Sequence, residues 1–421
     1  MKTHAAFFIA IRYLLGRAKE GGRYLRGAAA GIAVSLIPIV VTLIVADGMI
    51  RGITDRYIEL GTGHLQIHSF EGTGNWDEII SGLEGLNRIR GVWEERYGLG
   101  VLVGKKGKTG ATIRSLDSSF WQDQGSARFI ELRSGSLDLE NERELLLGES
   151  LAESVGAETG DTVRIMTIRE GSGGRSIPRL TPFTVKGIVA SGYRELDALW
   201  CITNLEGAER ILSSGLSSSY LIVKTDDPYE GLERCFPEIF RVLSSGYGVY
   251  TWKQLMQSQY SSYESTRQLL LFIMALIVLV AAVNVSSATS MLVIERQRDI
   301  AVLKAAGAGP EKIRKIFIWG AFLTGLSGAL AGGGAGLLIG YFINPIVKGL
   351  ESVLSLVTGL FHGGRVRLLD PGYYLEKIPV IIDWSAVFVI IFATVLCSVI
   401  AALLPAARAG RLKPLDLLRK Y

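Results

Sequence analysis

The chain has 421 residues, of which 48% are hydrophobic, and it contains 50 glycines. This composition is more apolar than that of an ordinary soluble protein and indicates membrane spans. The net charge of +5 does not indicate nucleic-acid binding, because the basic residues gather beside apolar stretches. Three cysteines are too few for a disulfide framework, and their spacing does not show whether Cys201 and Cys235 pair.

Four apolar stretches are long enough to cross a membrane, since a hydrocarbon core of about 30 Å requires roughly 20 helical residues. The predicted spans are residues 27–47, 268–294, 316–347 and 384–407. Apart from Asp47 at the end of the first span, they contain no Asp, Glu, Lys or Arg. The first span is interpreted as an uncleaved anchor, because no convincing small-x-small cleavage site follows it.

The basic residues predict the orientation of the spans. Segments 1–26, 295–315 and 408–421 carry six, six and five Lys or Arg residues against one, three and one acids. By the positive-inside rule these segments are cytoplasmic, and the expected location is an inner (cytoplasmic) membrane. Segment 1–26 is predicted to hold a helix on the cytoplasmic leaflet, the alternative being a buried soluble helix.

The outer side consists of a periplasmic domain at 48–267 and a loop at 348–383. Alternating apolar residues predict strands at 64–68, 111–116, 162–166, 183–191 and 220–224. Helices are expected at 77–97, 148–156 and 251–267. The predicted fold is therefore an α-helical membrane protein with four transmembrane helices and a large mixed α+β periplasmic domain between the first and second. The polar insert 169–182 joins two strands and is expected to be an exposed loop or long hairpin.

Small residues repeat every four positions in the third span, at Gly328, Gly332, Gly336 and Gly340 among others. Such stripes allow helices to approach closely. The sequence leaves open whether they pack within one subunit or between two.

No cofactor, metal or catalytic group is predicted. The stretch LVGKKGKT at 102–109 ends like a phosphate-binding loop, but Leu102 occupies the position of its first glycine. His64 and His68 lie on a predicted strand without a third ligand at suitable spacing. The chain is not expected to be an enzyme.

Residues 295–317, ERQRDIAVLKAAGAGPEKIRKIF, predict a short amphipathic helix, a break at 307–310 and a second helix leading into the third span. A short exposed helix between spans suits docking into a cleft of a partner protein. The alternative is an ordinary solvated loop.

The segment ERQRDIAVLKAAGA resembles the coupling element of FtsX-like ABC permeases, with Asp299 where the family has Glu. The tail LLPAARAGRLKPLDLLRKY is similar to the end of the same family. Three further segments resemble the LolC/LolE lipoprotein-releasing permeases: FFIAIRYLLGRAKEGGR, ELLLGESLAESVGAETGDTVRI and YYLEKIPVIIDW.

The resemblance implies partners and site residues. A separate LolD-like ATPase would hydrolyse ATP, a second identical or homologous permease subunit would complete the machine, and lipoproteins would pass to a LolA-like periplasmic carrier. The implied ATPase contacts are Glu295, Arg298, Asp299, Leu303, Lys304, Gly307 and Ala308. The implied carrier-binding loop includes Arg169, Pro178, Arg179 and Pro182, although its GSGG run differs from the more apolar loop of the family.

Other functions remain open at this point. One is another FtsX-like role, in a MacB-like efflux pump or in the regulation of cell-wall hydrolases. The other is a membrane-anchored sensor or adhesion module, which would leave segment 295–317 unexplained.

Overall fold

The computed structural model of the chain describes residues 3–15, 22–70, 76–170, 176–212, 217–243, 246–361, 375 and 377–412. The chain divides into two compact units. The first comprises Met1–Gly48, Tyr263–Leu360 and Pro379–Tyr421, and the second comprises Met49–Ser262 and Phe361–Ile378. Parts of four predicted regions lie outside the described residues: 1–2 and 16–21 of the N-terminal segment, 171–175 of the carrier loop, 362–374 and 376 of the outer loop, and 413–421 of the tail.

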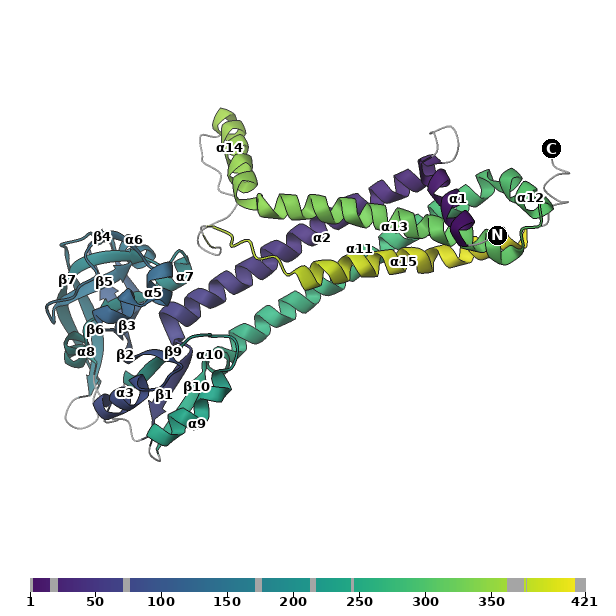
Figure 1. The fold of residues 1–421 in the computed structure, drawn as a ribbon. Helices are drawn as coiled ribbons and strands as arrows, with labels where there is room; N and C mark the ends of the chain where they lie inside the picture. Colours follow the sequence, from purple (N-terminus) through teal and green to yellow (C-terminus); the bar gives the residue numbers. More distant parts are fainter. Residues whose placement is uncertain are drawn as a thin grey trace. The chain divides into compact units, whose positions relative to one another are not determined.

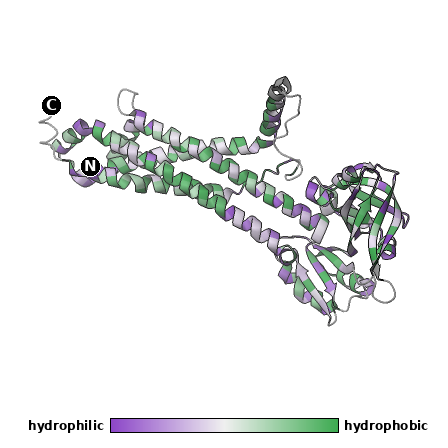
Figure 2. Cartoon of the chain, turned by 180° about the vertical axis from the view of Figure 1, so that it is seen from behind, coloured by the Kyte–Doolittle hydropathy of each residue, from purple (hydrophilic) through white to green (hydrophobic). Residues whose placement is uncertain are grey.

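Among the described residues, four helices are long and apolar enough to cross a membrane. They are α2 (Gly22–Arg56), α11 (Gln257–Glu295), α13 (Pro310–Tyr341) and α15 (Trp384–Arg411) (Figure 1). Hydrophobic residues run along all of them (Figure 2). The prediction of four membrane helices is confirmed, and α2 and α11 continue well beyond the apolar stretches that indicated them.

The four predicted glycines of α13 pack against α2. A Cβ added to Gly332 would lie 2.6 Å from the carbonyl oxygen of Ala33, closer than Cβ atoms come to other atoms. The remaining three are equally close to α2: Gly328 to Ala29 and Ile32, Gly336 to Val40, and Gly340 to Ile44. This stripe therefore serves packing within one subunit.

An ionic cluster lies at one end of the helix bundle. Arg267 of α11 pairs with Asp47 of α2 (Nε to Oδ1, 3.2 Å) and with Asp383, the residue before α15 (Nη2 to Oδ2, 3.6 Å). Asp383 also caps α15 by accepting the backbone N–H groups of Ser385 and Ala386. Because charged groups are costly in hydrocarbon, this cluster marks the level at which the helices leave the apolar part of the membrane.

The third long helix ends before the apolar stretch 316–347 does. It ends at Tyr341, and after Phe342 a separate helix, α14 (Ile343–Phe361), begins. Pro345 explains the break, because it has no N–H to bond the carbonyl of Tyr341 and its ring would clash with that carbonyl. The predicted loop 348–383 therefore begins within a helix.

The N-terminal helix α1 (Thr3–Leu15) packs against α13. The ring of Phe7 lies edge-on to that of Trp319, with centroids 5.2 Å apart, and Tyr13 lies near Phe317 at 6.5 Å. Phe8 is 67% exposed. The position of α1 on the cytoplasmic leaflet stays a prediction.

The described strands of the second unit form one ten-stranded sheet in the order β10-β1-β9-β2-β3-β8-β5-β7-β4, with β6 pairing β2 and β7. The strands are β1 (Leu65–Ser69), β2 (Ile89–Val103), β3 (Lys108–Ser115), β4 (Glu131–Gly135), β5 (Glu144–Gly148), β6 (Thr162–Glu170), β7 (Ser176–Ala190), β8 (Trp200–Thr203), β9 (Ser217–Thr225) and β10 (Tyr247–Thr251). The helices are η2 (Tyr57–Thr62), α3 (Trp76–Glu84), α4 (Ser118–Gln122), α5 (Gln124–Phe129), α6 (Glu149–Val155), α7 (Arg194–Asp197), α8 (Leu205–Ile211), α9 (Leu232–Val242) and α10 (Trp252–Leu255). The predicted mixed α+β domain is confirmed.

Two apolar clusters form the core of this unit. One surrounds Phe183 and Leu147 and includes Cys201, and the other surrounds Trp252 and Leu221 and includes Cys235. Both cysteines are buried and free. They lie in different clusters, so in this structure they form no pair.

The predicted helix at 77–97 is wrong over its second half. Helix α3 ends at Glu84, and residues 89–103 form β2, which pairs with β9 on one side and β3 on the other. Val92, Trp93 and Tyr97 favour a strand. Pairing with β9 along this stretch, joined by β3 from Arg96 onward, decided the outcome, and a local sequence pattern does not contain information on distant strands.

Candidate functional site

The connector between α11 and α13 folds into a short helix, α12 (Gln297–Ala305). Gly307 ends it with a φ of 87°, a conformation that favours glycine. The N–H of Gly307 bonds the carbonyl of Lys304 (3.0 Å), and that of Ala308 bonds the carbonyl of Leu303 (2.9 Å). This pair of hydrogen bonds is a Schellman motif, and Pro310 then starts α13 at a position that suits proline. The sequence GAGP therefore determines a sharp turn between two helices.

The inner face of α12 is part of an apolar cluster. Ile300 and Ala301 are each 1% exposed. Ile300 packs with residues of α2, α11, α13 and α15, among them Leu25, Phe317 and Ala406. Leu303 and Ala308, both predicted to contact a partner, are partly buried against this same cluster. The cluster holds α12 firmly on the end of the helix bundle.

An ionic and aromatic contact fastens the start of α12. Arg296, at the N-cap, pairs with Asp299 (Nη1 to Oδ2, 3.0 Å), and its guanidinium lies 5.0 Å from the ring centroid of Tyr13. Burial, together with the charge and hydrogen bond of Asp299, raises the pKa of Tyr13 to about 12. The hydroxyl of Tyr13 therefore stays protonated and donates to Asp299. Asp299, which was predicted to contact a partner protein, is therefore already bonded to Arg296 and Tyr13 of the same chain.

Lys304 fastens the other end of α12. Its ammonium group donates to the carbonyl oxygens of Gly410 (2.8 Å) and Leu412 (2.5 Å), at the C-terminal end of α15. A cation there satisfies carbonyls that have no partner within the helix and complements the helix dipole. Lys304 thus joins the connector to the last long helix.

The opposite face of α12 is open. Arg298 and Val302 are exposed, the latter at 61%, and Ala305, Ala306 and Gly307 continue the surface. Arg298, Val302 and Ala305 repeat at intervals of four and three residues, so they share one helix side. Val302 was missed by the sequence analysis, which selected Leu303. Helix geometry places Val302 on the far side from Ile300, but only the structure shows that Ile300 is the buried one of the two.

The seven predicted contact residues therefore divide into two groups. Glu295, Arg298 and Gly307 are exposed. Asp299, Leu303, Lys304 and Ala308 are partly buried and hold the connector in place.

The predicted carrier loop is the end of a long hairpin formed by β6 and β7. Their ladder runs from Thr162 opposite Thr184 to Glu170 opposite Ser176, with Arg169 opposite Ile177 and Pro178 opposite Ile168. Arg179 donates to the carbonyl of Arg210 (3.2 Å), and Pro182 lies lower in the ladder, opposite Arg164. Three apolar side chains of the hairpin are at least half exposed: Ile168, Ile177 and Leu180. Because residues opposite each other in the ladder share a face and successive residues alternate, Ile168 and Leu180 lie on one face of the hairpin and Ile177 on the other.

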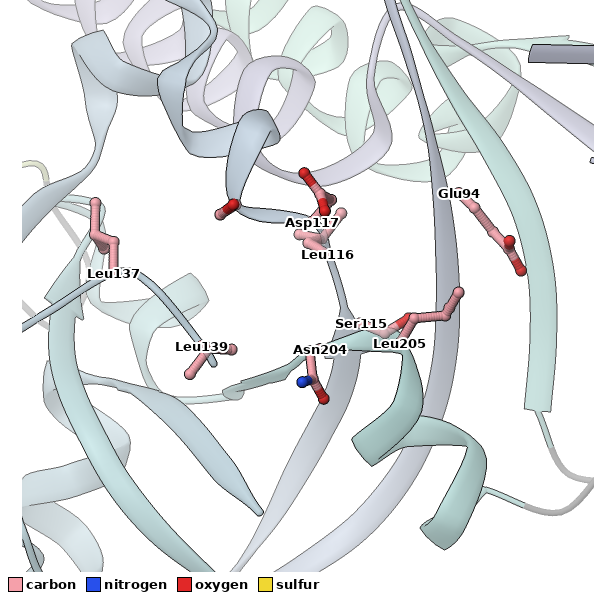
Figure 3. A pocket seen from close by; sticks show the side chains of 9 residues that line it. Glu94, Ser115, Leu116, Asp117, Leu137, Leu139, Asn204 and Leu205 are labelled. Carbon is pink, nitrogen blue, oxygen red and sulfur yellow. The ribbon is translucent and has the colours of Figure 1, made fainter. Parts of the chain in front are cut away.

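The second unit also has a cavity of about 180 Å³ near the ends of β3 and β8 (Figure 3). Its polar lining residues already stabilise local structure. Asp117 accepts the N–H of Ser119 (2.8 Å), and Asn204 accepts that of Gly207 (2.9 Å). These groups serve as helix caps, so the cavity offers no evident chemistry.

Buried charges of the second unit gather where η2 leads into the sheet. The ammonium of Lys224, which is fully buried, donates to Asp123 (2.9 Å), and it lies 3.1 Å from a carboxylate oxygen of Glu59. Burial opposes ionisation of Asp123, but the hydrogen bond and charge of Lys224 hold the pKa of Asp123 below its usual range. Glu59 also contacts Nε2 of His64 (3.2 Å), and Nδ1 of His64 accepts the N–H of Thr225 (2.9 Å). Both nitrogens of His64 are thus used by the fold.

Comparison with known proteins agrees with this architecture. Residues 271–414 match the FtsX-like permease C-terminal family, and residues 27–230 match the MacB-like periplasmic core domain. The lipoprotein-releasing system transmembrane protein LolC of Xylella fastidiosa is 26% identical over 419 residues, which cover 98% of each chain. LolE of Haemophilus influenzae is 24% identical over 432 residues, covering 99% of each chain.

Among solved structures, the periplasmic region of MacB from Actinobacillus actinomycetemcomitans is 15% identical, with a TM-score of 0.32, and the alignment covers 47% of this chain and 92% of that one. The resemblance to FtsX-like permeases, and to LolC and LolE among them, is confirmed by the family matches and the full-length relatives.

Proposed function

We propose that this chain, which is similar to FtsX-like permeases and to the MacB-like periplasmic core domain, is the transmembrane subunit of a lipoprotein-releasing ABC machine. The observation that carries this proposal is similarity over the whole length to LolC and LolE, which are named as lipoprotein-releasing proteins. The machine extracts lipoproteins from the inner membrane and passes them to a periplasmic carrier. A MacB-like efflux role or an FtsX-like regulatory role is not favoured by these full-length relatives.

The energetics explain why such a machine uses ATP. Each CH₂ group that leaves hydrocarbon costs about 0.8 kcal/mol, so spontaneous release of a protein with several acyl chains is negligible. The spans contain no charged residue between their ends, which suits force transmission better than ion transport. Helix α11 is continuous from Gln257 to Glu295 and reaches α12 directly. A displacement at α12 is therefore passed along one helix.

ATP hydrolysis belongs to a separate LolD-like subunit that binds the open face of α12. Arg298 supplies charge and Val302 an apolar contact, with Glu295 and Gly307 at the rim. Lys304, Asp299, Leu303 and Ala308 hold this face in position. The buried cluster beneath α12 supports a role of this helix in force transmission, because a firmly packed helix transmits force better than a flexible loop.

The proposal also includes the orientation of the chain in the membrane and two further partners. The termini and α12 lie in the cytoplasm, as their Lys and Arg content indicates, and the second unit lies in the periplasm. A second permease subunit, identical or homologous, completes the transmembrane part. The exposed pair Ile168 and Leu180 on the β6–β7 hairpin supports recruitment of a LolA-like carrier. Pro178 and Pro182 lie on the same face of the ladder, and Arg169 and Arg179 occupy neighbouring positions.

The docking face is tested by co-purification of the ATPase with the full chain in detergent. Val302→Asp places a charge on the open face and is expected to abolish recovery of the ATPase. The matched control is Leu99→Asp, at an exposed aliphatic residue of the second unit (70%), which is expected to leave recovery unchanged. Retained ATPase binding by Val302→Asp would show that α12 is not the docking element.

The substrate is tested separately. Depletion of the protein followed by membrane fractionation is expected to leave lipoproteins in the inner membrane. Normal sorting of lipoproteins during depletion, with ATPase binding intact, would contradict the lipoprotein role and leave the permease assignment standing.

A further inference from the structure

Helix α14 has apolar and polar residues on opposite sides. At 100° per residue, one side holds apolar residues and the other holds polar ones. Among residues 343–355 the apolar side consists of Ile343, Ile346, Val347, Leu350, Val353 and Leu354, and the polar side consists of Asn344, Lys348, Glu351, Ser352 and Ser355. The sequence analysis treated most of this segment as a loop, and the helical structure brings out the pattern.

The apolar side of α14 is largely uncovered within the chain. Ile346, Leu350 and Val353 are 44%, 49% and 60% exposed. On the other side, Ser352 is exposed, and its hydroxyl donates to the carbonyl of Lys348 (2.8 Å). An apolar strip of this length needs a covering partner.

The position of α14 in the chain indicates what covers it. It begins two residues after α13 ends, and Gly340 of α13 lies against Ile44, one turn before Asp47 of the ionic cluster. The start of α14 therefore lies at the boundary between hydrocarbon and water. Aromatic residues that favour this boundary stand at the same level: Tyr341 (63% exposed), Phe342 (51%) and Trp384 (65%).

The geometry excludes a membrane crossing by α14. The next membrane helix, α15, starts at Trp384, directly after Asp383, which pairs with Arg267 in the same ionic cluster. The chain thus returns to the same side of the membrane. A crossing would also expose five polar side chains to lipid. The break at Phe342 instead turns α14 away from the direction of α13 (Figure 1).

We propose that α14 lies in the plane of the membrane surface, on the side where α13 ends, with its apolar side in the acyl region. The partner of this surface is the phospholipid itself. The described part of α14 carries one Lys and one Glu, so apolar burial rather than attraction to anionic headgroups drives the contact. The inference rests on the membrane position of the long helices and does not depend on lipoprotein release.

The test uses spin labels on the full chain in zwitterionic phospholipid nanodiscs. Single labels are placed through Leu350→Cys and Val353→Cys on the apolar side and through Lys348→Cys and Ser352→Cys on the polar side. Cys397 is replaced by Ser, while Cys201 and Cys235 are buried. Collision rates with oxygen, which concentrates in lipid, and with a water-soluble nickel chelate then report the surroundings of each label.

The expected result is high oxygen and low nickel accessibility at 350 and 353, at equal depth, with the reverse at 348 and 352. Adding anionic lipid is expected to change these values little. High nickel accessibility at 350 and 353 would place α14 in water. Low accessibility to both reagents would place it against protein, and a greater depth at 353 than at 350 would mean that it enters the membrane. Each of these three results overturns the proposal.

Discussion

Replacing Gly332 by Ala is expected to weaken the packing of α13 on α2. The new Cβ would lie 2.6 Å from the carbonyl oxygen of Ala33 and 2.7 Å from its Cα. Both are backbone atoms, so no side chain can rotate away and the helices must separate. Overpacking of this kind costs about 1–3 kcal/mol. The higher helix propensity of Ala offsets at most about 1 kcal/mol of this cost. The free energy of unfolding is therefore expected to fall by about 1–2 kcal/mol.

Gly334 provides a matched control on the same helix. A Cβ at Gly334 meets nothing within 4 Å, so Gly334→Ala is expected to leave stability unchanged or raise it by less than about 1 kcal/mol. The assay is reversible unfolding of the full chain in mixed micelles at increasing denaturing detergent. The reasoning is refuted if Gly332→Ala is as stable as Gly334→Ala. An intermediate loss in Gly336→Ala, where the added Cβ would meet the side chain of Val40 at 2.8 Å, would support it further.

Two predictions concern the second unit. Burial raises the pKa of Asp197 to about 6 from 3.8, so the folded state holds a proton that the unfolded state releases. The free energy of unfolding is expected to fall by up to about 3 kcal/mol as pH rises from about 4 to 6.5. Asp197→Asn should flatten this dependence in denaturant titrations, and an unchanged pH profile would contradict the assignment. Lys224→Met removes the fully buried cation beside Glu59 and Asp123 and leaves them only the partly exposed Arg90, so it is expected to cost about 3 kcal/mol. Lys253→Met, on an exposed lysine, is the control, and equal stability of the two variants would show that the buried network contributes little.

Local sequence was sufficient for the features that depend on a single helix or turn. Each membrane helix needs about 20 apolar residues because the bilayer acts as its solvent, so the four spans follow from composition alone. The turn after α12 follows from Gly307, because few other residues adopt its positive φ. The glycine stripe of α13 likewise predicts a close helix contact.

Strand pairing and contacts between distant segments decided the features that local sequence did not predict. Residues 89–97 form a strand, not the predicted helix, because β9 pairs along this whole stretch and β3 joins on the other side from Arg96 onward. Lys304 binds the end of α15, more than 100 residues away in the chain. The sequence around Lys304 shows that the residue is charged, but not which group it binds. Which valine or leucine of α12 faces outward depended on the cluster that buries Ile300.

The four spans, their charge bias and the α12 segment with its Gly307 turn were thus determined by the sequence alone, because hydropathy and backbone conformation act locally. Tertiary structure decided that α13 packs its glycines on α2, that Val302 rather than Leu303 is outermost, and that residues 343–361 form an amphipathic helix. In each case the deciding quantity is which surface is covered by a neighbour, and only the folded arrangement of the helices specifies that.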